Sequence, residues 1–377
     1  MLCRHSHDGA SRFIPYRKTL LERCLEMEII KTKQSRRDQI DFEHLGFGDT
    51  FSDHMLSMEY RDREWGEPQI IPYGTIEISP AICSLHYGQI IFEGLKAFYS
   101  RNGAIHLFRP QKYHERMNLS CRRLCIPEMD FSVFIEGLKE LIRLDKEWIP
   151  RKKGYSLYLR PFIFASDNFL GVKISETYRY MVITSPVGAY YKEGMNPVKL
   201  ATETEYIRAA KGGLGAAKTP ANYAATLLPA EEAKKKGFTQ VLWLDGIERK
   251  YIEEVGTMNM AFVIDNELIT PPLEGTILPG VTRDSVIHLA KEWKMNVSER
   301  RISIDEVFAA SKEGRLQEAF GTGTAAVISP VGEIHHEGNK IILNDNKIGP
   351  LAQKLYDEIT GIHYGERVDR FGWIYTV

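Results

Sequence analysis

The sequence predicts an α+β protein of mixed α/β character that is built from two domains. From Ile40 onward, segments with the apolar period of a helix alternate with segments rich in aromatic and β-branched residues, without a fixed repeat. The chain has 377 residues, whereas one domain usually holds about 100–200. Pro186-Val187-Gly188 and the polar stretch from Lys192 to Pro197 interrupt the alternation, so the best boundary between the two domains is at about residue 190.

The composition favours a globular protein and argues against several classes of function. Hydrophobic residues make up 43% of the chain and charged residues 26%, as in ordinary packed proteins. The 49 Lys and Arg residues balance 50 Asp and Glu residues, so we expect no nucleic-acid partner. The longest apolar runs, such as Met260–Ile264, are too short to span a membrane.

The cysteines indicate a cytoplasmic protein with reduced thiols. They form neither a CxxC pair nor an even framework that would suggest disulfide bonds, and we expect no metal site. The five residues are Cys3, Cys24, Cys83, Cys121 and Cys125.

We expect four regions along the chain. Residues 1–39 form an N-terminal tail, because they are rich in charge and carry only a short apolar period around Leu20–Leu25. An upstream start ahead of Met27 and an Arg-rich transit peptide are alternatives for this segment, although Asp8 and Glu22 do not suit the latter. The other regions are a smaller α/β domain (40–188), a linker (189–201) and a larger sheet domain with helices (202–377).

Local patterns place several elements in the first domain. Leu95–Tyr99 and Ala104–Phe108 flank Asn102-Gly103 and should form a β-hairpin. A helix should begin at Pro110 and carry Arg116. Further elements are a helix beginning at Asp130 or Ser132 and strands at Tyr155–Ala165 and Tyr178–Ser185. Tyr158 and Arg160 have the same parity on one strand, so both should project from the same face.

The second domain reads as a sheet with helices packed on it. A helix should run from Asn222 to Lys236 and end at Gly237. A second helix is expected at Thr282–Trp293, and Ser303–Glu306 has the spacing of a capping box. Strands are expected at Val198–Thr204, Gln240–Leu244, Met258–Ile264 and Glu267–Thr270.

Three loops rich in small residues could present backbone N–H groups to an anion. They are Lys211–Lys218, Pro279–Thr282 and Gly321–Ala326. Each alone is a weak signal, because the glycine spacing matches neither common nucleotide-binding motif and helix starts are frequent. Together with Arg116 they begin to suggest one bound phosphate.

Five motifs follow one another along the chain. They are Phe92-Glu-Gly-Leu-Lys-Ala-Phe98, Leu107-Phe-Arg-Pro110, Lys211-Gly-Gly-Leu-Gly-Ala-Ala-Lys218 with Asn222-Tyr223, Glu253-Glu-Val-Gly-Thr-Met-Asn259 and Leu278-Pro-Gly-Val-Thr282. Together they resemble the motifs of the branched-chain amino acid aminotransferases, which are pyridoxal-phosphate enzymes of fold type IV. The similarity extends from about Phe42 to Trp373, in order and at family-like spacing.

The resemblance implies pyridoxal 5′-phosphate as the cofactor and assigns the residues around it. Lys218 matches the lysine that forms the imine and moves the proton. Glu254 matches the carboxylate at the pyridine nitrogen, and we expect its neighbour Glu253 to be solvated, since adjacent strand residues face opposite ways. Tyr223 matches the tyrosine at the phenolic oxygen. The phosphate would be bound by Arg116, the amides of Val281 and Thr282, and the Thr324 hydroxyl.

The resemblance also implies a substrate pocket that serves Leu, Ile, Val and glutamate in a ping-pong reaction with 2-oxoglutarate. Backbone N–H groups of Thr324 and Ala325, with Tyr158, would bind the α-carboxylate, and Arg160 would bind the distal carboxylate of glutamate. The family works as a homodimer, and Val172 is the residue that the partner subunit would contribute. An apolar slot would be lined by Phe47, Tyr87, Phe92, Tyr190, Thr257 and Met258.

Two alternatives stay open at this point. Another fold-type-IV enzyme, such as a D-amino acid aminotransferase or aminodeoxychorismate lyase, would keep Lys218, Glu254 and Arg116 but needs a different pocket. The Glu-Val-Gly-Thr-Met and Tyr-x-Arg matches speak against it. The same loops could instead serve a phosphate-ligand binding protein without covalent chemistry, for which Lys218 would have no use.

Overall fold

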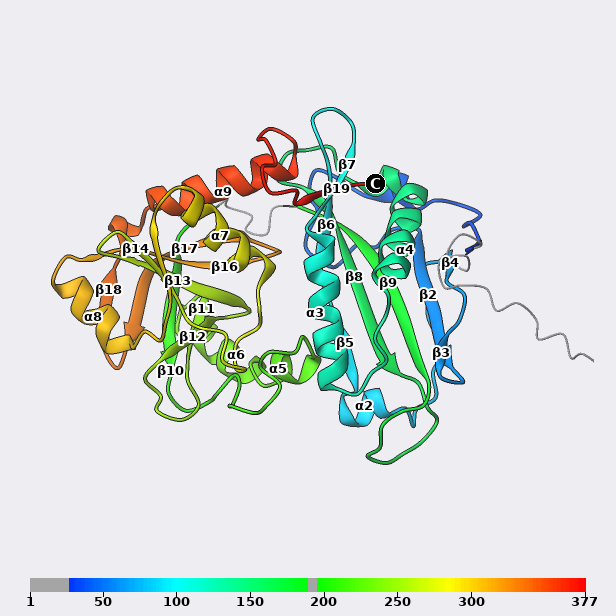
Figure 1. The fold of residues 1–377 in the computed structure, drawn as a ribbon, viewed down its shortest axis with the longest axis horizontal. Helices are drawn as coiled ribbons and strands as arrows, with labels where there is room; N and C mark the ends of the chain where they lie inside the picture. Colours follow the sequence, from blue (N-terminus) through cyan, green and yellow to red (C-terminus); the bar gives the residue numbers. More distant parts are fainter. Residues whose placement is uncertain (1–26, 189–194) are drawn as a thin grey trace, which may run out of the picture.

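A computed structural model describes residues 27–188 and 195–377. Most of the expected tail, the start of the expected linker and Tyr190 lie outside the described residues. Within them, the chain forms two sheets, one in each half of the sequence, and Figure 1 shows them side by side.

The first sheet has ten strands in the described chain, mostly antiparallel, in the order β1-β4-β2-β9-β8-β6-β7-β19, with β3 beside β2 and β5 beside β8. Their bounds are β1 Glu28–Ile29, β2 His54–Arg61, β3 Glu64–Trp65, β4 Gln69–Pro72, β5 Ile90–Phe92, β6 Leu95–Tyr99, β7 Ile105–Phe108, β8 Ser156–Ala165, β9 Tyr178–Val187 and β19 Ile374–Thr376.

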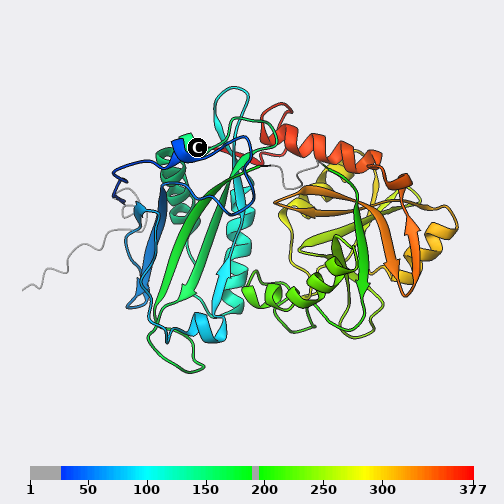
Figure 2. The same ribbon diagram turned by 180° about the vertical axis from the view of Figure 1, so that it is seen from behind.

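Helices cover one face of this sheet. The longer ones are α3 (Pro110–Arg123) and α4 (Phe131–Leu144), whose apolar residues pack on β-strand residues such as Leu56 and Leu159 in a single core. Figure 2 shows the face that these helices leave open. The short elements of this half are α2 (Cys83–Tyr87), η1 (Arg37–Gln39) and η2 (Lys146–Trp148).

The second sheet has nine described strands and closes into a barrel. The path β12-β11-β10-β17-β16-β13 returns to its start because β12 also pairs with β13, while β14 and β15 extend from β13 and β18 pairs with β17. The bounds are β10 Val198–Glu203, β11 Gln240–Leu244, β12 Ile252–Val255, β13 Met258–Ile264, β14 Glu267–Thr270, β15 Asn296–Glu299, β16 Leu316–Gly323, β17 Val327–His336 and β18 Asn339–Ile342.

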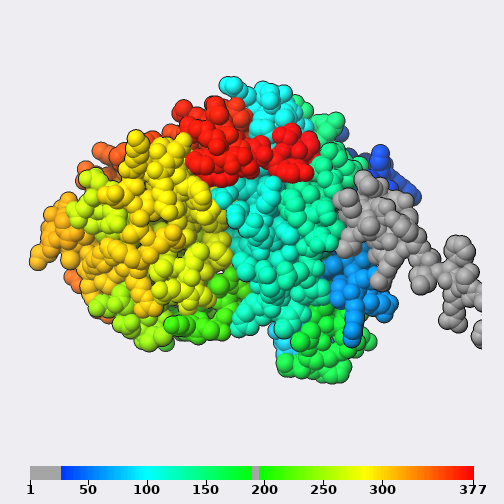
Figure 3. All heavy atoms as spheres, in the orientation of Figure 1, coloured from blue at the N-terminus to red at the C-terminus, as the bar shows by residue number. Residues whose placement is uncertain are grey.

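Helices surround the barrel and join it to the first sheet. They are α5 (Pro220–Ala224), α6 (Leu227–Lys235), α7 (Val281–Glu292), α8 (Ile304–Lys312), α9 (Pro350–His363) and η3 (Asn344–Asn346). Helix α9 packs on β16 and β17 and also contacts β7 of the first sheet. In Figure 3 the C-terminal residues lie across the junction of the two halves.

Most expected elements are confirmed. The hairpin pairs β6 with β7, and α3 begins at Pro110. Gly103 has a φ of +84° and carries the turn alone. Asn102, which was also expected to have a positive φ, does not have one. Its side-chain Oδ1 accepts hydrogen bonds from Ser100 Oγ and the Ala104 N–H. At Ser303 half of the expected capping box forms, since the Glu306 carboxylate binds Arg300.

The helix expected over Asn222–Lys236 is in fact two helices, α5 and α6, with a break at Ala225–Thr226. Pro229 lies in the first turn of α6, where its missing N–H is tolerated, but a continuous helix would need that group to donate to Ala225. Thr226 Oγ1 also donates to the Tyr223 carbonyl. Gly237 follows the second helix with a φ of +85°, as expected of a C′ glycine.

The division into domains stays a prediction, and the strands depart from its boundaries in three places. β1 adds Glu28–Ile29 of the expected tail to the first sheet, β10 begins at Val198 within the expected linker, and β19 returns to the first sheet from the end of the chain. A strand at β10 was expected from its local pattern, but β1 and β19 are only two and three residues long, so no local period predicts them.

Candidate active site

A cavity of about 180 Å³ lies between the two halves of the molecule. The first half contributes residues from β5, β8 and α3. The second half contributes the loop before α5, the β12–β13 turn, the start of α7 and the β16–β17 turn. The expected residues that line it are Phe47, Phe92, Arg116, Tyr158, Arg160, Lys218, Tyr223, Glu254, Thr257, Met258, Val281, Thr282, Thr324 and Ala325.

Lys218 is held by its backbone, which leaves its side chain in the cavity. Its N–H donates to Ser120 Oγ of α3 (2.8 Å), and its carbonyl accepts from the Phe92 N–H of β5 (3.0 Å). The side chain extends along the aromatic rings of Phe92 and Tyr223, with Nζ 4.9 and 5.3 Å from the ring centroids. Nζ donates to Tyr223 OH (2.8 Å). Backbone bonds from the first half of the chain therefore fix the position of this lysine.

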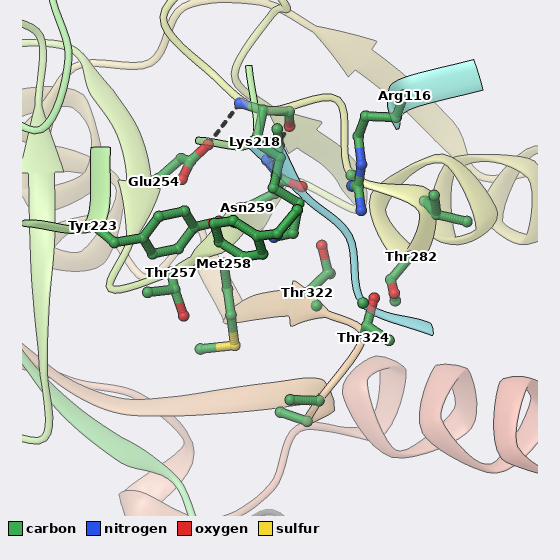
Figure 4. A pocket seen from close by; sticks show the side chains of 18 of the residues that line it. Arg116, Lys218, Tyr223, Glu254, Thr257, Met258, Asn259, Thr282, Thr322 and Thr324 are labelled. Atoms are coloured by element: carbon green, nitrogen blue, oxygen red, sulfur yellow. Dashed lines mark hydrogen bonds between the residues drawn. The ribbon is translucent and has the colours of Figure 1, made fainter. Parts of the chain in front are cut away.

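Glu254 lies on β12 and is the acidic residue of the cavity. The Leu278 N–H donates to its Oε1 (2.8 Å), the bond that Figure 4 marks, and Arg208 Nη2 lies 3.4 Å from the same oxygen. Burial raises the pKa of Glu254, while Arg208, the Leu278 N–H and Lys218 oppose this shift. Burial alone would favour a neutral carboxyl group, and the nearby positive charges favour the carboxylate.

Glu253 points away from the cavity, as the alternation of strand residues predicts, but the expectation that it is solvated is wrong. It is only 7% exposed, because the far side of β12 is covered by the segment that follows β14. Thr276 Oγ1 of that segment donates to Glu253 Oε1 (2.5 Å). Of the two adjacent glutamates, only Glu254 lines the cavity.

Arg116 reaches the cavity from α3 and forms a buried ion pair. Its Nε and Nη2 each lie 2.8 Å from a carboxylate oxygen of Glu93, which is fully buried, and Nη1 donates to the Pro279 carbonyl (3.1 Å). Burial disfavours the charged guanidinium, but Glu93 raises the pKa of Arg116 above its usual value. Arg116 therefore stays cationic, beside the segment that leads into α7.

The first turn of α7 faces the same part of the cavity. Its N-cap, Gly280, has no side chain to accept a hydrogen bond from the first N–H groups, and Val281 and Thr282 line the cavity. A helix N-terminus carries a positive partial charge. In Figure 4, Arg116, Thr282 and Thr324 lie on one side of the cavity, and Tyr223 and Glu254 lie on the other. The groups that could bind an anion thus lie on the side of the cavity opposite the Glu254 carboxylate.

The turn between β16 and β17 forms the remaining wall. Thr324 Oγ1 shares a hydrogen bond with Tyr113 OH of α3 (2.9 Å). Thr322 Oγ1 is buried and has no hydrogen-bond partner among the described residues. Such an atom is rare in a native structure and indicates a missing partner in the cavity.

Tyr158 and Arg160 project from the same face of β8, as their parity predicts. Arg160 Nη2 donates to Tyr158 OH (3.0 Å), and the guanidinium lies 4.8 Å from the Phe92 ring centroid. Phe47 packs edge-on against Tyr158 with ring centroids 5.1 Å apart. A cation is thereby held within a largely aromatic wall.

Two expected substrate residues do not line this cavity. Tyr87 on α2 is 47% exposed, and Val172 is 84% exposed in the loop between β8 and β9. Neither lines the cavity formed by one chain. Tyr190 lies outside the described residues.

The sequence analysis missed several residues that hold the site together. Glu93 pairs with Arg116, Ser120 binds the Lys218 backbone, Arg208 accompanies Glu254, and Lys96 Nζ donates to the Ala325 carbonyl (2.7 Å). Glu93 and Lys96 lie inside a quoted motif, but only the fold brings them to Arg116 and Ala325. Ser120 and Arg208 carry no local signal, because their partners are distant in sequence.

Comparisons with known proteins agree with this geometry. Residues 90–334 match the family described as amino-transferase class IV. The chain is 53% identical to branched-chain-amino-acid aminotransferase 2 of Bacillus subtilis over 94% of this chain and 97% of that protein. It is 46% identical to the branched-chain-amino-acid aminotransferase of Mycolicibacterium smegmatis, over 87% and 91% of the two chains.

Solved structures give the same result. The Escherichia coli branched-chain amino acid aminotransferase superposes with a TM-score of 0.71 at 28% identity, over 85% of this chain and 98% of that one. The T.th. enzyme complexed with N-(5′-phosphopyridoxyl)-L-glutamate superposes with a TM-score of 0.67 at 25% identity, over 84% and 97%. The chain therefore belongs to the amino-transferase class IV family, as a branched-chain-amino-acid aminotransferase of fold type IV.

Proposed function

We propose that this aminotransferase uses pyridoxal 5′-phosphate, bound at Lys218, to transfer the amino group of Leu, Ile or Val to 2-oxoglutarate. The observation that carries the proposal is the arrangement of one cavity, with Lys218 Nζ beside Tyr223 OH (2.8 Å), a buried carboxylate on one side and an anion-binding helix start on the other. One structure of the T.th. relative carries pyridoxamine 5′-phosphate, and another is complexed with a phosphopyridoxyl glutamate.

The residues of the cavity fit this cofactor. Arg116, the first N–H groups of α7 and the Thr324 hydroxyl would bind the phosphate, and the unpartnered Thr322 hydroxyl faces the same space. Glu254 would meet the protonated pyridine nitrogen, and Tyr223 would bind the phenolic oxygen. When bound, the cofactor withdraws electrons from the amino acid Cα, so that its proton becomes removable.

The chain's own residues then have distinct tasks. Lys218 Nζ takes the Cα proton and keeps it within the cavity, because the adjacent Phe92 and Tyr223 rings exclude water from one side. Arg208 and the Leu278 N–H oppose the effect of burial on Glu254 and so favour its carboxylate form. The backbone bonds from Ser120 and Phe92 hold the lysine in place through both halves of the reaction.

The substrate would lie between the β16–β17 turn and the aromatic wall. Backbone N–H groups of Thr324 and Ala325, with Tyr158 OH, would bind the α-carboxylate. The side chain of a branched-chain substrate would contact Phe47, Phe92 and Met258. Arg160, whose Nε has no hydrogen-bond partner among the described residues, would meet the second carboxylate of glutamate or 2-oxoglutarate.

A donor panel tests the proposal. Purified protein with added cofactor should convert 2-oxoglutarate to glutamate with L-leucine, L-isoleucine or L-valine, and far more slowly with L-alanine or D-leucine. The released 2-oxo acids and glutamate are measured by chromatography. Equal rates with L- and D-leucine, or no glutamate with any branched donor, would contradict the proposed reaction.

Replacement of Arg160 by Met should separate the two kinds of substrate. The second carboxylate of 2-oxoglutarate would lose its cation, an interaction worth about 2–5 kcal/mol when partly buried, while the apolar wall stays in place. We therefore expect the KM for 2-oxoglutarate to rise at least about thirty-fold and that for leucine only slightly, in half-reaction assays with each substrate alone. An equal loss for both substrates would mean that Arg160 serves the α-carboxylate or the strand.

We further propose a homodimer that forms through an exposed apolar patch. The patch comprises α2 and the adjoining β8–β9 loop, which are joined by a bridge between Ile82 and Asn168. Monomeric proteins rarely expose such clusters of large apolar side chains. The exposed residues are Leu85, Tyr87, Leu170, Val172 and Ile174.

Val172→Asp should weaken this dimer, because the new carboxylate would have to lose its water at the interface. Analytical ultracentrifugation should give a dissociation constant at least about ten-fold higher than that of the wild type. Val368→Asp is the matched control, since Val368 is 75% exposed elsewhere on the surface. A wild-type monomer, or equal effects of the two substitutions, would contradict the assignment of the patch.

In the described part of the chain, no helix combines the length and apolar character needed to cross a membrane. The cytoplasmic location and the absence of a nucleic-acid partner stay predictions from composition.

A further inference from the structure

Lys96 is a buried lysine without an acidic partner. It lies on β6, is 9% exposed, and its Nζ donates to the Ala325 carbonyl (2.7 Å). Within the described residues no carboxylate lies in ion-pair distance of this ammonium group. The lysines that do form ion pairs are mostly exposed, as Lys152 and Lys153 are. Buried charges in proteins are normally paired. The burial of this ammonium group without a carboxylate partner therefore calls for an explanation.

The surroundings of Lys96 do not supply a negative charge. His363 of α9 lies close enough to interact with it, and this ring stacks on Phe98 with centroids 4.4 Å apart. Burial, followed by the charges of Lys96 and His106, lowers the pKa of His363 to about 3. The imidazole is thus neutral. Burial lowers the pKa of Lys96 itself to about 8, so that its charge is retained near neutral pH.

The group that Lys96 binds belongs to a strained turn of the cavity. Residues 324–326 connect β16 to β17, and Val327 directly after them has a φ of +64°. This left-handed conformation is rare for a β-branched residue, and such outliers persist only where surrounding contacts impose them. Two contacts from the first half of the chain hold this turn, namely Lys96 Nζ on the Ala325 carbonyl and Tyr113 OH on Thr324 Oγ1.

We propose that Lys96 is a positioning residue for the α-carboxylate of the substrate: it orients the turn through the Ala325 carbonyl and places a positive charge behind the turn that this carboxylate would meet. The inference rests on the proposed function, in which N–H groups of this turn bind that carboxylate. Because a peptide unit is planar, fixing the Ala325 carbonyl also fixes the N–H of Ala326 on the opposite side, and it restrains the backbone of Ala325, whose own N–H is one of the two that would bind the carboxylate. The carboxylate would bring a negative charge to the turn that Lys96 holds.

The test compares carboxylate binding in three variants of the holoenzyme. The probe is 4-methylpentanoate, which has the carboxylate and side chain of leucine but no amino group, and binding is measured by calorimetry. Lys96→Met, which keeps the length but removes the charge, should weaken probe binding about ten- to a hundred-fold and raise the KM for leucine in parallel. Cofactor content and thermal stability should stay at wild-type levels, because an unpaired buried charge is removed.

Lys96→Arg should restore probe binding to within about three-fold of the wild type, since it returns a charged donor. Lys112→Met is the control, because Lys112 is an exposed lysine of α3 that pairs with Glu115. If Lys96→Met does not fold, Lys96→Gln replaces it, and it should bind the probe clearly more weakly than Lys96→Arg. If Lys96→Arg and Lys96→Met bind the probe equally well and the wild type catalyses transamination, the inference is overturned but the proposed function is not. A wild type without transamination would instead overturn the proposed function.

Discussion

Lys218→Ala should lower the rate of leucine transamination by a factor of about 10³ or more, because in the proposed reaction this lysine both attaches the cofactor and moves the proton. The protein should stay folded. Lys218 contributes to the structure through its backbone N–H and carbonyl, which Ser120 and Phe92 bind and which alanine retains. The measurements are steady-state kinetics, thermal unfolding and the visible absorption of bound cofactor.

Lys211→Ala is the matched control for this variant. Lys211 begins the same glycine-rich loop but is exposed and does not line the cavity. We expect its activity to stay within a few-fold of the wild type. Transamination by Lys218→Ala at a rate near that of the control would contradict the assignment of the catalytic lysine.

Glu254→Gln should keep the cofactor but lower the rate by about 10²–10³, since a neutral amide does not stabilise a protonated pyridine nitrogen. The pH dependence of stability provides a second readout in cofactor-free protein. Burial raises the pKa of Glu254 above its usual 4.5. Its contribution to stability is therefore present at low pH and declines as the pH rises through the raised value. Relative to the wild type, the variant should thus gain stability as the pH rises above the usual carboxyl value of 4.5.

Glu253→Gln gives a close control, because the same substitution is made one residue earlier on the same strand. Glu253 is also buried but points to the opposite side of β12, where Thr276 binds it. Its rate should stay within a few-fold of the wild type even if stability changes. A larger loss of rate in Glu253→Gln than in Glu254→Gln would mean that the two carboxylates have been assigned in the wrong order.

Local patterns predicted many individual elements, but they missed others, such as β2, β12 and α9, and they did not predict how the elements assemble. The hairpin of β6 and β7 and the start of α3 depend on Gly103 and Pro110, whose backbone preferences act over a few residues. The barrel also needs β10 to pair with β17 and β13 with β16, and β19 pairs with β7 across most of the chain. Long-range pairs of this kind leave no period in the sequence.

In the candidate site, too, local patterns predicted some features, whereas others depend on contacts between residues that are distant in sequence. Parity alone predicted that Tyr158 and Arg160 share a face and that only one of two adjacent glutamates faces the cavity. The choice of Lys218 among many lysines came from resemblance, since a lysine's surroundings are set by the fold. Glu93 and Lys96 illustrate what was not predictable, because their burial and partners arise only where the two halves meet.

The most direct test of the proposed chemistry is a single half-reaction with leucine in the absence of any 2-oxo acid. Purified holoenzyme mixed with excess L-leucine should release one 4-methyl-2-oxopentanoate per active site and then stop, with loss of the visible absorption of the lysine-bound cofactor. Addition of 2-oxoglutarate should restore that absorption and yield an equal amount of glutamate. Release of no 2-oxo acid from leucine alone, or restoration without formation of glutamate, would contradict the account.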